Sequence, residues 1–345
     1  MVFDFVPADA PGIAAIVILA GTVATWFGSQ WLEESAEQLS AYYGLPAVVQ
    51  GSVVVAVGSS FPELASVVFT ALSGVFDMGV GAIVGSAIFN ILVIPAVSNI
   101  LSDQDLEAGR AIVYKEALFY MVAVAVFVLT LALAVIYEPV PAAGALVGEL
   151  TRLLALIPLL LYGLYLFIQW QDVSDFDPGV EPEQIAVGHE WRRLLLGLVV
   201  ILIAVELLVS GIESAGETFG VPDFLAGVTI LAAATSLPDL LVSVRSARAG
   251  RGVTSLGNVF GSNTFDLLVA IPIGVLIVGS VSIDFAVAIP MLAVLTVVTV
   301  VLFTLLRTNL SLSSPEAYVL LILYILFFGW VFAETVGLTQ LLSSS

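Results

Sequence analysis

Long apolar segments separated by short polar breaks recur along the whole chain. A helix needs roughly 20 mostly apolar residues to cross a lipid bilayer. Ten segments reach that length, so we predict an all-α membrane protein with ten transmembrane helices. The predicted spans cover approximately residues 11–31, 45–73, 78–101, 112–137, 149–170, 192–216, 222–248, 254–278, 282–306 and 315–339.

The composition agrees with this pattern and excludes several classes of protein. Hydrophobic residues make up 60% of the chain and charged residues 11%, unlike a soluble domain. The net charge of −19 leaves no basic surface for nucleic acid, and no phosphate loop is present to bind a nucleotide. Cysteine is absent and the single histidine, His189, lies in a polar stretch. A thiolate or histidine metal site inside the membrane is therefore excluded.

Two alternative membrane functions lack their usual sequence features. An intramembrane hydrolase would carry a GxGD or HExxH motif, and neither occurs here. A passive channel of the potassium type would carry a TVGYG filter, which is also absent. We therefore expect a carrier rather than an enzyme or a channel.

The longest polar break, residues 171–191, divides the chain into two halves of five predicted spans each. This segment is too short for a folded domain and is typical of a solvated linker. The first half covers residues 1–170 and the second covers residues 192–345.

The basic residues indicate how the chain is oriented. With the N-terminus outside, Arg152 is the one basic residue in an outer loop. Inner loops are normally enriched in Lys and Arg. We therefore predict a multi-pass protein of the cell membrane, with a cytoplasmic linker and both termini outside. The basic residues of the inner loops are Arg110, Lys115, Arg192, Arg193, Arg245, Arg248, Arg251 and Arg307.

The second half of the chain repeats the first after a shift of 176 residues, without a gap over some fifty positions. Each half contains five spans, an odd number, so the second half enters the membrane from the opposite side. We therefore predict two inverted five-helix repeats, an arrangement that places a transporter's substrate site near the midplane. The matching pairs include Ser60 and Ser236, Pro62 and Pro238, Gly81 and Gly257, and Gly85 and Gly261.

Each half carries an acidic residue directly after a proline, deep inside an apolar span. Residues 58–63 read GSSFPE and residues 234–239 read ATSLPD. Proline has no N–H and its ring clashes with the carbonyl four residues back, so we expect each helix to break there. A carboxylate inside a membrane is costly without a cation or proton as its partner. Glu63 and Asp239 are therefore predicted to belong to a transport site.

A second pair of polar residues follows each carboxylate on the next span. Ser86 and Asn90 are four residues apart, as are Ser262 and Asp266, so each pair shares one helix face. Carboxylate, hydroxyl and backbone oxygens together suit a hard cation such as Ca²⁺ or Na⁺. Three carboxylates suit several monovalent ions, or one divalent ion with Asp266 protonated.

These motifs resemble the two hallmark repeats of the cation/calcium exchanger superfamily, which read G-T/S-S-x-P-E/D and then G-S-N/A-x-F-N/D. Here the repeats read GSSFPE with GSAIFN, and ATSLPD with GSNTFD. The resemblance implies a secondary antiporter that exchanges Ca²⁺ for Na⁺ by alternating access and needs no cofactor. It implies ion contacts at Ser59, Glu63, Ser86, Asn90, Thr235, Asp239, Ser262 and Asp266.

The sequence departs from the family pattern at Ala87 and Ala234, where asparagine and glycine are usual. The aspartate at position 266 is similar to that of the potassium-dependent branch, although related prokaryotic exchangers carry it without potassium dependence. K⁺-dependent Na⁺/Ca²⁺ exchange and H⁺/Ca²⁺ exchange therefore stay open as alternatives. The GNxxE-type repeats of proton-coupled vacuolar exchangers are absent, which disfavours proton coupling.

Overall fold

The computed structural model describes residues 11–45, 49–102, 104–142, 144, 146–174 and 185–339. Within these residues, eight helices are long and apolar enough to cross a membrane, and two bent helix pairs raise the number to ten if each pair is one span. The eight are α1 (Pro11–Tyr42), α5 (Phe76–Ile100), Gly109–Tyr137, which ends in α7 (Ala117–Tyr137), α8 (Arg152–Ser174), α9 (Val187–Phe219), Gly252–Val278, α15 (Phe285–Arg307) and α16 (Ser314–Thr335).

Each bent pair breaks at a serine that stands two residues before a proline. In the first pair, η1 (Gln50–Val55) and α3 (Ala56–Ser59) meet α4 (Phe61–Ser73) at 46°. In the second, α10 (Asp223–Ala226), η3 (Gly227–Leu231) and α11 (Ala232–Thr235) meet α12 (Leu237–Arg248) at 42°. Pro62 and Pro238 lie in the first turn of the new helix, where a missing N–H costs nothing. The helix breaks expected from the two prolines are therefore present.

Two short antiparallel sheets join loops at the two ends of the bundle. Strand β1 (Leu106–Glu107) pairs with β4 (Ser311–Leu312), and β2 (Val147–Thr151) pairs with β3 (Ser280–Asp284). In the topology predicted from the charge pattern, the two loops that each sheet joins lie on the same side of the membrane, and the two sheets lie on opposite sides. The all-α prediction omitted these strands, because pairs of two to five residues leave no alternating pattern long enough to recognise.

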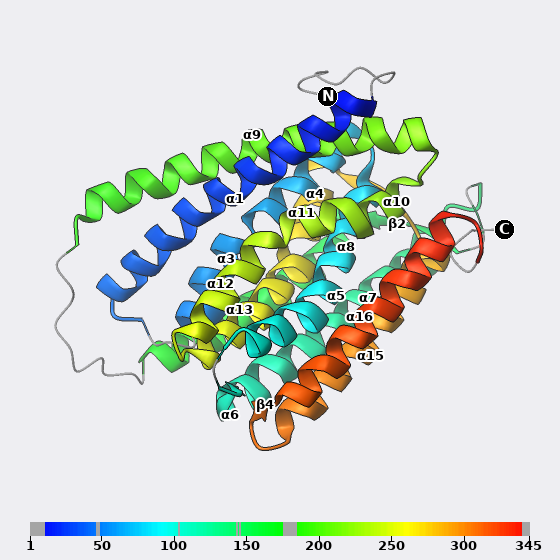
Figure 1. The fold of residues 1–345 in the computed structure, drawn as a ribbon. Coiled ribbons are helices and arrows are strands. Elements are labelled where there is room, and N and C mark those ends of the chain that lie inside the picture. The colour runs from blue at the N-terminus through cyan, green and yellow to red at the C-terminus, as the bar shows by residue number, and fades with distance from the viewer. Residues whose placement is uncertain are drawn as a thin grey trace.

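The most buried helices lie at the centre of the bundle (Figure 1). In α5, 89% of the most apolar 18-residue stretch is buried, and in Gly252–Val278 the corresponding share is 78%. The second segment consists of α13 (Gly252–Phe265), η4 (Asp266–Ala270) and α14 (Ile271–Val278). Both are rich in small residues and buried on most sides, as expected of a helix surrounded by protein. The paired helices α1 and α9 lie along one side of this centre, and α15 and α16 along the opposite side.

Helices α1 and α9 approach closely because glycines face the contact. A Cβ added at Gly28 would lie 2.9 Å from the Ile201 side chain, and one at Gly21 would lie 2.8 Å from Leu208. Small residues commonly line contacts between membrane helices, since hydrocarbon provides no hydrophobic force to join them.

Helices also occupy the ends of the predicted central linker. Helix α8 continues to Ser174 and α9 begins at Val187. Residues 175–184 of the linker lie outside the described part of the chain.

A buried polar network holds the start of the first broken span. Tyr165 donates to Glu116 Oε2 at 2.8 Å and to the carbonyl of Ser52 at 3.1 Å. Gln169 donates to Glu116 Oε1 at 2.8 Å, and Lys115, the single lysine of the chain, lies 2.9 Å from the same oxygen. Since Ser52 belongs to η1, this network links η2 (Ile112–Glu116) and α8 to the broken span.

Replacing Tyr165 by Phe is expected to lower the free energy of unfolding by about 1–3 kcal/mol, because the Glu116 carboxylate and the Ser52 carbonyl lose a buried donor. Thermal unfolding of the purified protein in detergent would measure the change. Tyr318→Phe, at a position 56% exposed on α16, serves as the control. Equal melting temperatures for the two variants would contradict the assigned role.

Candidate functional site

The two broken spans place their acidic residues against the two central helices. Glu63 lies in the first turn of α4 and Asp239 in the first turn of α12, and neither side chain is exposed. A helix N-terminus carries a partial positive charge, which favours a carboxylate there. Ser86 and Asn90 come from α5, and Ser262 comes from α13.

Asp239 is held by donors from both halves of the chain. Ser262 donates to Oδ1 at 3.0 Å, Asn258 donates to the same oxygen at 3.4 Å, and Asn90 donates to Oδ2 at 2.9 Å. Asn90 also donates to Asn263 Oδ1 at 3.0 Å. The carboxylate is therefore oriented by α5 and α13 together.

Glu63 has a sparser set of partners. Ser86 and Ser236 donate to Oε1 at 3.4 and 3.5 Å, and the two hydroxyls lie 2.6 Å apart. The second oxygen, Oε2, has no hydrogen-bond partner among the described residues. One oxygen of this carboxylate is thus held in place while the other stays available to a ligand.

Several other buried oxygens at the site also lack a partner within the described residues. They are both carboxylate oxygens of Asp266, the side-chain carbonyl of Asn90 and the hydroxyl of Ser60. None of these side chains is exposed to solvent. An unpaired buried acceptor costs about 1–3 kcal/mol, and more if it is charged. Oxygens of this kind can take a bound cation as the missing partner.

The carboxyl groups of Glu63, Asp239 and Asp266 lie within electrostatic range of one another. Among the described residues, no three acidic or histidine side chains form a compact metal-binding group. Amide and hydroxyl groups contact the acids instead, so an ion here would take ligands of mixed charge. Such a set suits an ion that must also be released.

The two remaining predicted residues differ in orientation. Ser59 donates to Asn258 Oδ1 at 3.0 Å and lies 3.4 Å from the hydroxyl of Ser262, so it joins the network around Asp239. Thr235 donates to the Leu231 carbonyl of its own helix at 3.0 Å. All eight predicted residues are fully buried, and Ser59 also lies 3.3 Å from the Ala56 carbonyl of its own helix.

The sequence analysis missed three residues of the network: Ser236, Asn258 and Asn263. Asn258 precedes Ser262 and Asp266 by four and eight residues, so all three share one face of the same span. That spacing could have indicated Asn258 as a residue of the site. The match between the two halves does not indicate it, because Ala82 occupies the corresponding position in the first half.

Glycines allow each central helix to touch the broken span of the other half. A Cβ at Gly85 would lie 2.4 Å from the Val228 carbonyl oxygen, and one at Gly261 would lie 2.3 Å from the Ser52 carbonyl oxygen. Real Cβ atoms do not come so close to oxygen. The two contacts differ by 176 positions in both partners.

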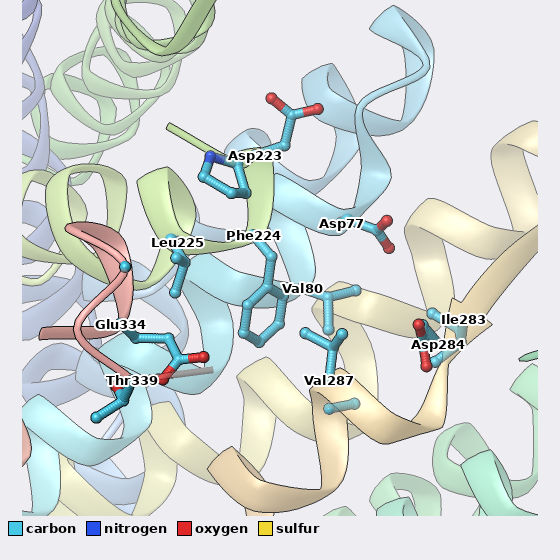
Figure 2. A pocket seen from close by; sticks show the side chains of 13 residues that line it. Asp77, Val80, Asp223, Phe224, Leu225, Ile283, Asp284, Val287, Glu334 and Thr339 are labelled. Carbon is cyan, nitrogen blue, oxygen red and sulfur yellow. Dashed lines mark hydrogen bonds between the residues drawn. The ribbon is translucent and has the colours of Figure 1, made fainter. Parts of the chain in front are cut away.

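A cavity of about 560 Å³ lies at the end of the bundle that holds β2 and β3. Figure 2 shows Asp77, Asp223 and Asp284 around the apolar side chains of Val80, Phe224 and Val287. Glu334 lies across these apolar side chains from Asp77 and Asp284. None of the eight predicted residues lines this cavity. Its acids would raise the local concentration of cations at this end of the protein.

Comparisons with known proteins identify relatives of this chain. The family model described as sodium/calcium exchanger protein matches residues 13–171 and 189–333. The sodium/calcium exchanger MaX1 of Methanosarcina acetivorans is 26% identical over 343 residues, which cover 90% of this chain and 96% of that protein. The human sodium/potassium/calcium exchanger 5 is 47% identical over 62 residues, a match limited to 18% of this chain and 12% of that protein.

Solved structures show the same fold. The sodium-calcium exchanger NCX_Mj, soaked with Na⁺ and Sr²⁺, superimposes with a TM-score of 0.67 over 92% of this chain and 98% of that chain, at 22% identity. The named relatives are exchangers, which are transporters rather than enzymes. This multi-pass membrane chain therefore belongs to the sodium/calcium exchanger protein family.

Proposed function

We propose that the protein exchanges Ca²⁺ for Na⁺ by alternating access, with the ions bound at Glu63, Asp239 and Asp266. The observation that carries the proposal is a group of buried side-chain oxygens that have no hydrogen-bond partner within the described residues. They belong to Glu63, Asp266, Asn90 and Ser60. Family membership supports the choice of Na⁺ and Ca²⁺. The remaining predicted ligands, Ser59, Ser86, Thr235 and Ser262, complete the proposed site.

We further propose that the two halves, residues 1–170 and 192–345, form inverted repeats around this site. Equivalent contacts support the idea. Ser86 donates to Glu63 as Ser262 donates to Asp239, and both pairs of partners differ by 176 positions. The breaks at Ser60 and Ser236 have matching bends. Two such halves can exchange conformations and so open one site to either side in turn.

The positive-inside bias favours a cytoplasmic position for the β1–β4 end and the linker, with both termini outside. The acidic cavity near β2 and β3 would then face the exterior. If three Na⁺ are exchanged for one Ca²⁺, one net charge crosses per cycle, worth ~2.3 kcal/mol per 100 mV.

The test is Ca²⁺ flux in proteoliposomes with Na⁺, K⁺ and H⁺ gradients imposed one at a time. We expect an outward Na⁺ gradient alone to drive saturable uptake of radioactive Ca²⁺, and no cofactor or nucleotide to be needed. Uptake that rises linearly with Ca²⁺ and ignores the counter-ion would point to a channel and overturn the proposal.

A potassium-dependent exchanger is the second candidate. Two observations favour it: both oxygens of Asp266 lack a partner within the described residues, and a short segment is 47% identical to a sodium/potassium/calcium exchanger. In the same assay, this candidate requires that Ca²⁺ uptake fall to background when K⁺ is removed from the Ca²⁺ side. H⁺/Ca²⁺ exchange would instead show uptake driven by the H⁺ gradient.

A further inference from the structure

Helix α1 carries a buried polar stripe that the proposed ion site does not use. Thr25, Ser29 and Glu33 are spaced four residues apart and therefore share one face of the helix. Thr25 and Ser29 are 0% exposed, and Glu33 is 7% exposed. Within the described residues, the two hydroxyls and Glu33 Oε1 have no hydrogen-bond partner.

The stripe lies beside the broken spans. Helix α1 contacts η1, α3, α11 and α12, and a Cβ at Gly58 would lie 2.7 Å from Leu32, the neighbour of Glu33. Glu33 is within electrostatic range of both Asp239 and Arg245. Those two residues are six positions apart on α12, or about 9 Å along the helix axis. Glu33 therefore lies within electrostatic range both of a site carboxylate and of the arginine-bearing end of α12.

That end of α12 is also the β1–β4 end of the bundle. Arg248 donates to the Leu101 carbonyl at 3.1 Å, and Gly252 packs against the backbone of Glu107 in β1. At the rim, Arg251 pairs with Glu37 and Arg193 pairs with Glu34. Arginines thus pair with the outer acids of α1, whereas Glu33 lies deeper, next to the ion site.

Packing alone does not account for the stripe. The positions of α9 that match Thr25, Ser29 and Glu33 after the shift of 176 are Ile201, Val205 and Val209, all buried. In the other half, an apolar face is therefore sufficient for the packing of the equivalent helix, α9. Two hydroxyls and a carboxylate oxygen without a partner among the described residues are costly in a membrane helix, and such residues normally mark an ion pathway.

We propose that Glu33 forms an accessory cation site on the path between Asp239 and the β1–β4 end of the protein, with the hydroxyls of Ser29 and Thr25 about one and two turns away along α1. One carboxylate and two hydroxyls are hard oxygen donors, which suit a partly hydrated Na⁺ or Ca²⁺ rather than a transition metal. The second half has no such stripe on α9. The accessory site therefore serves one side of the membrane only. This inference rests on the proposed exchange function.

Glu33→Gln is the direct test, in proteoliposomes of known orientation. Because the chain has no cysteine, a single Gln104→Cys substitution in the exposed loop before β1 reports orientation through an impermeant maleimide. We expect the variant to raise the half-saturating Ca²⁺ and Na⁺ concentrations about five- to tenfold on the β1–β4 side, the size expected for loss of one partly screened charge. The values on the other side and the maximal rate should stay within about twofold.

Glu37→Gln is the matched control, since it removes one charge from the same helix at a half-exposed position. It should leave both sides unchanged. A Glu33→Gln variant that alters neither side, or both sides equally, overturns the inference. If that variant fails to fold, Ser29→Ala decides in its place: a rise of two- to threefold on the β1–β4 side alone supports the site, and no change overturns it. Absence of exchange in the unmodified protein would instead overturn the proposed function.

Discussion

Glu63→Gln and Asp239→Asn are each expected to abolish Ca²⁺ uptake into Na⁺-loaded proteoliposomes. Each change removes a charge from a site that no solvent reaches, while keeping the size of the side chain. Removing one partner of a buried charge pair costs about 3–5 kcal/mol, so Ca²⁺ binding should weaken by a factor of at least about 100. Initial rates of uptake over a range of Ca²⁺ concentrations would measure the loss.

Glu107→Gln provides the control for this experiment, because Glu107 is an exposed acid of β1, away from the site. It should transport at the normal rate. The thermal unfolding of all three variants would show that they fold. Near-normal uptake by both site variants would remove these two residues from the ion site and, with them, the proposed mechanism.

The structure also distinguishes two of the eight proposed ligands. Thr235 donates to its own helix, whereas Ser262 donates to Asp239. The loss of the Ser262 hydroxyl should therefore affect ion binding more than the loss of the Thr235 hydroxyl. The sequence motifs alone treat the two positions as equivalent.

Gly261→Ala is expected to produce the second large effect, loss of both stability and transport. The added Cβ would lie 2.3 Å from the Ser52 carbonyl oxygen and 2.7 Å from other Ser52 backbone atoms. Backbone atoms inside a π-helical turn cannot rotate away, so α13 must separate from η1. Overpacking of this kind costs about 1–3 kcal/mol or more.

Separation of these two helices would also displace Ser262 from Asp239, since Ser262 follows the glycine directly. Thermal unfolding in detergent and Ca²⁺ uptake together would detect the two consequences. Gly163→Ala is the control, because no atom lies within 4 Å of the Cβ it would add. A Gly261→Ala protein with the melting temperature and uptake of the parent would show that the close contact is not required.

Local physical rules were sufficient for much of this protein. The length of each apolar segment predicts the spans, because a helix needs roughly 20 apolar residues to cross the hydrocarbon core of a membrane. Proline predicts the two breaks, since it removes one donor and clashes with the preceding turn. The spacing of four residues places Ser86 with Asn90 and Ser262 with Asp266, because that is nearly one helical turn.

Contacts between segments distant in sequence needed the tertiary structure. The partners of Asp239 include Asn90, which is 149 residues away, and the proximity of Glu33 to Asp239 joins α1 to α12. Helical periodicity defines the faces of a helix but not the helix that each face meets. Which buried oxygens keep a partner, and which are left for an ion, depends on that choice of neighbours, and only the packing of the whole bundle decides it.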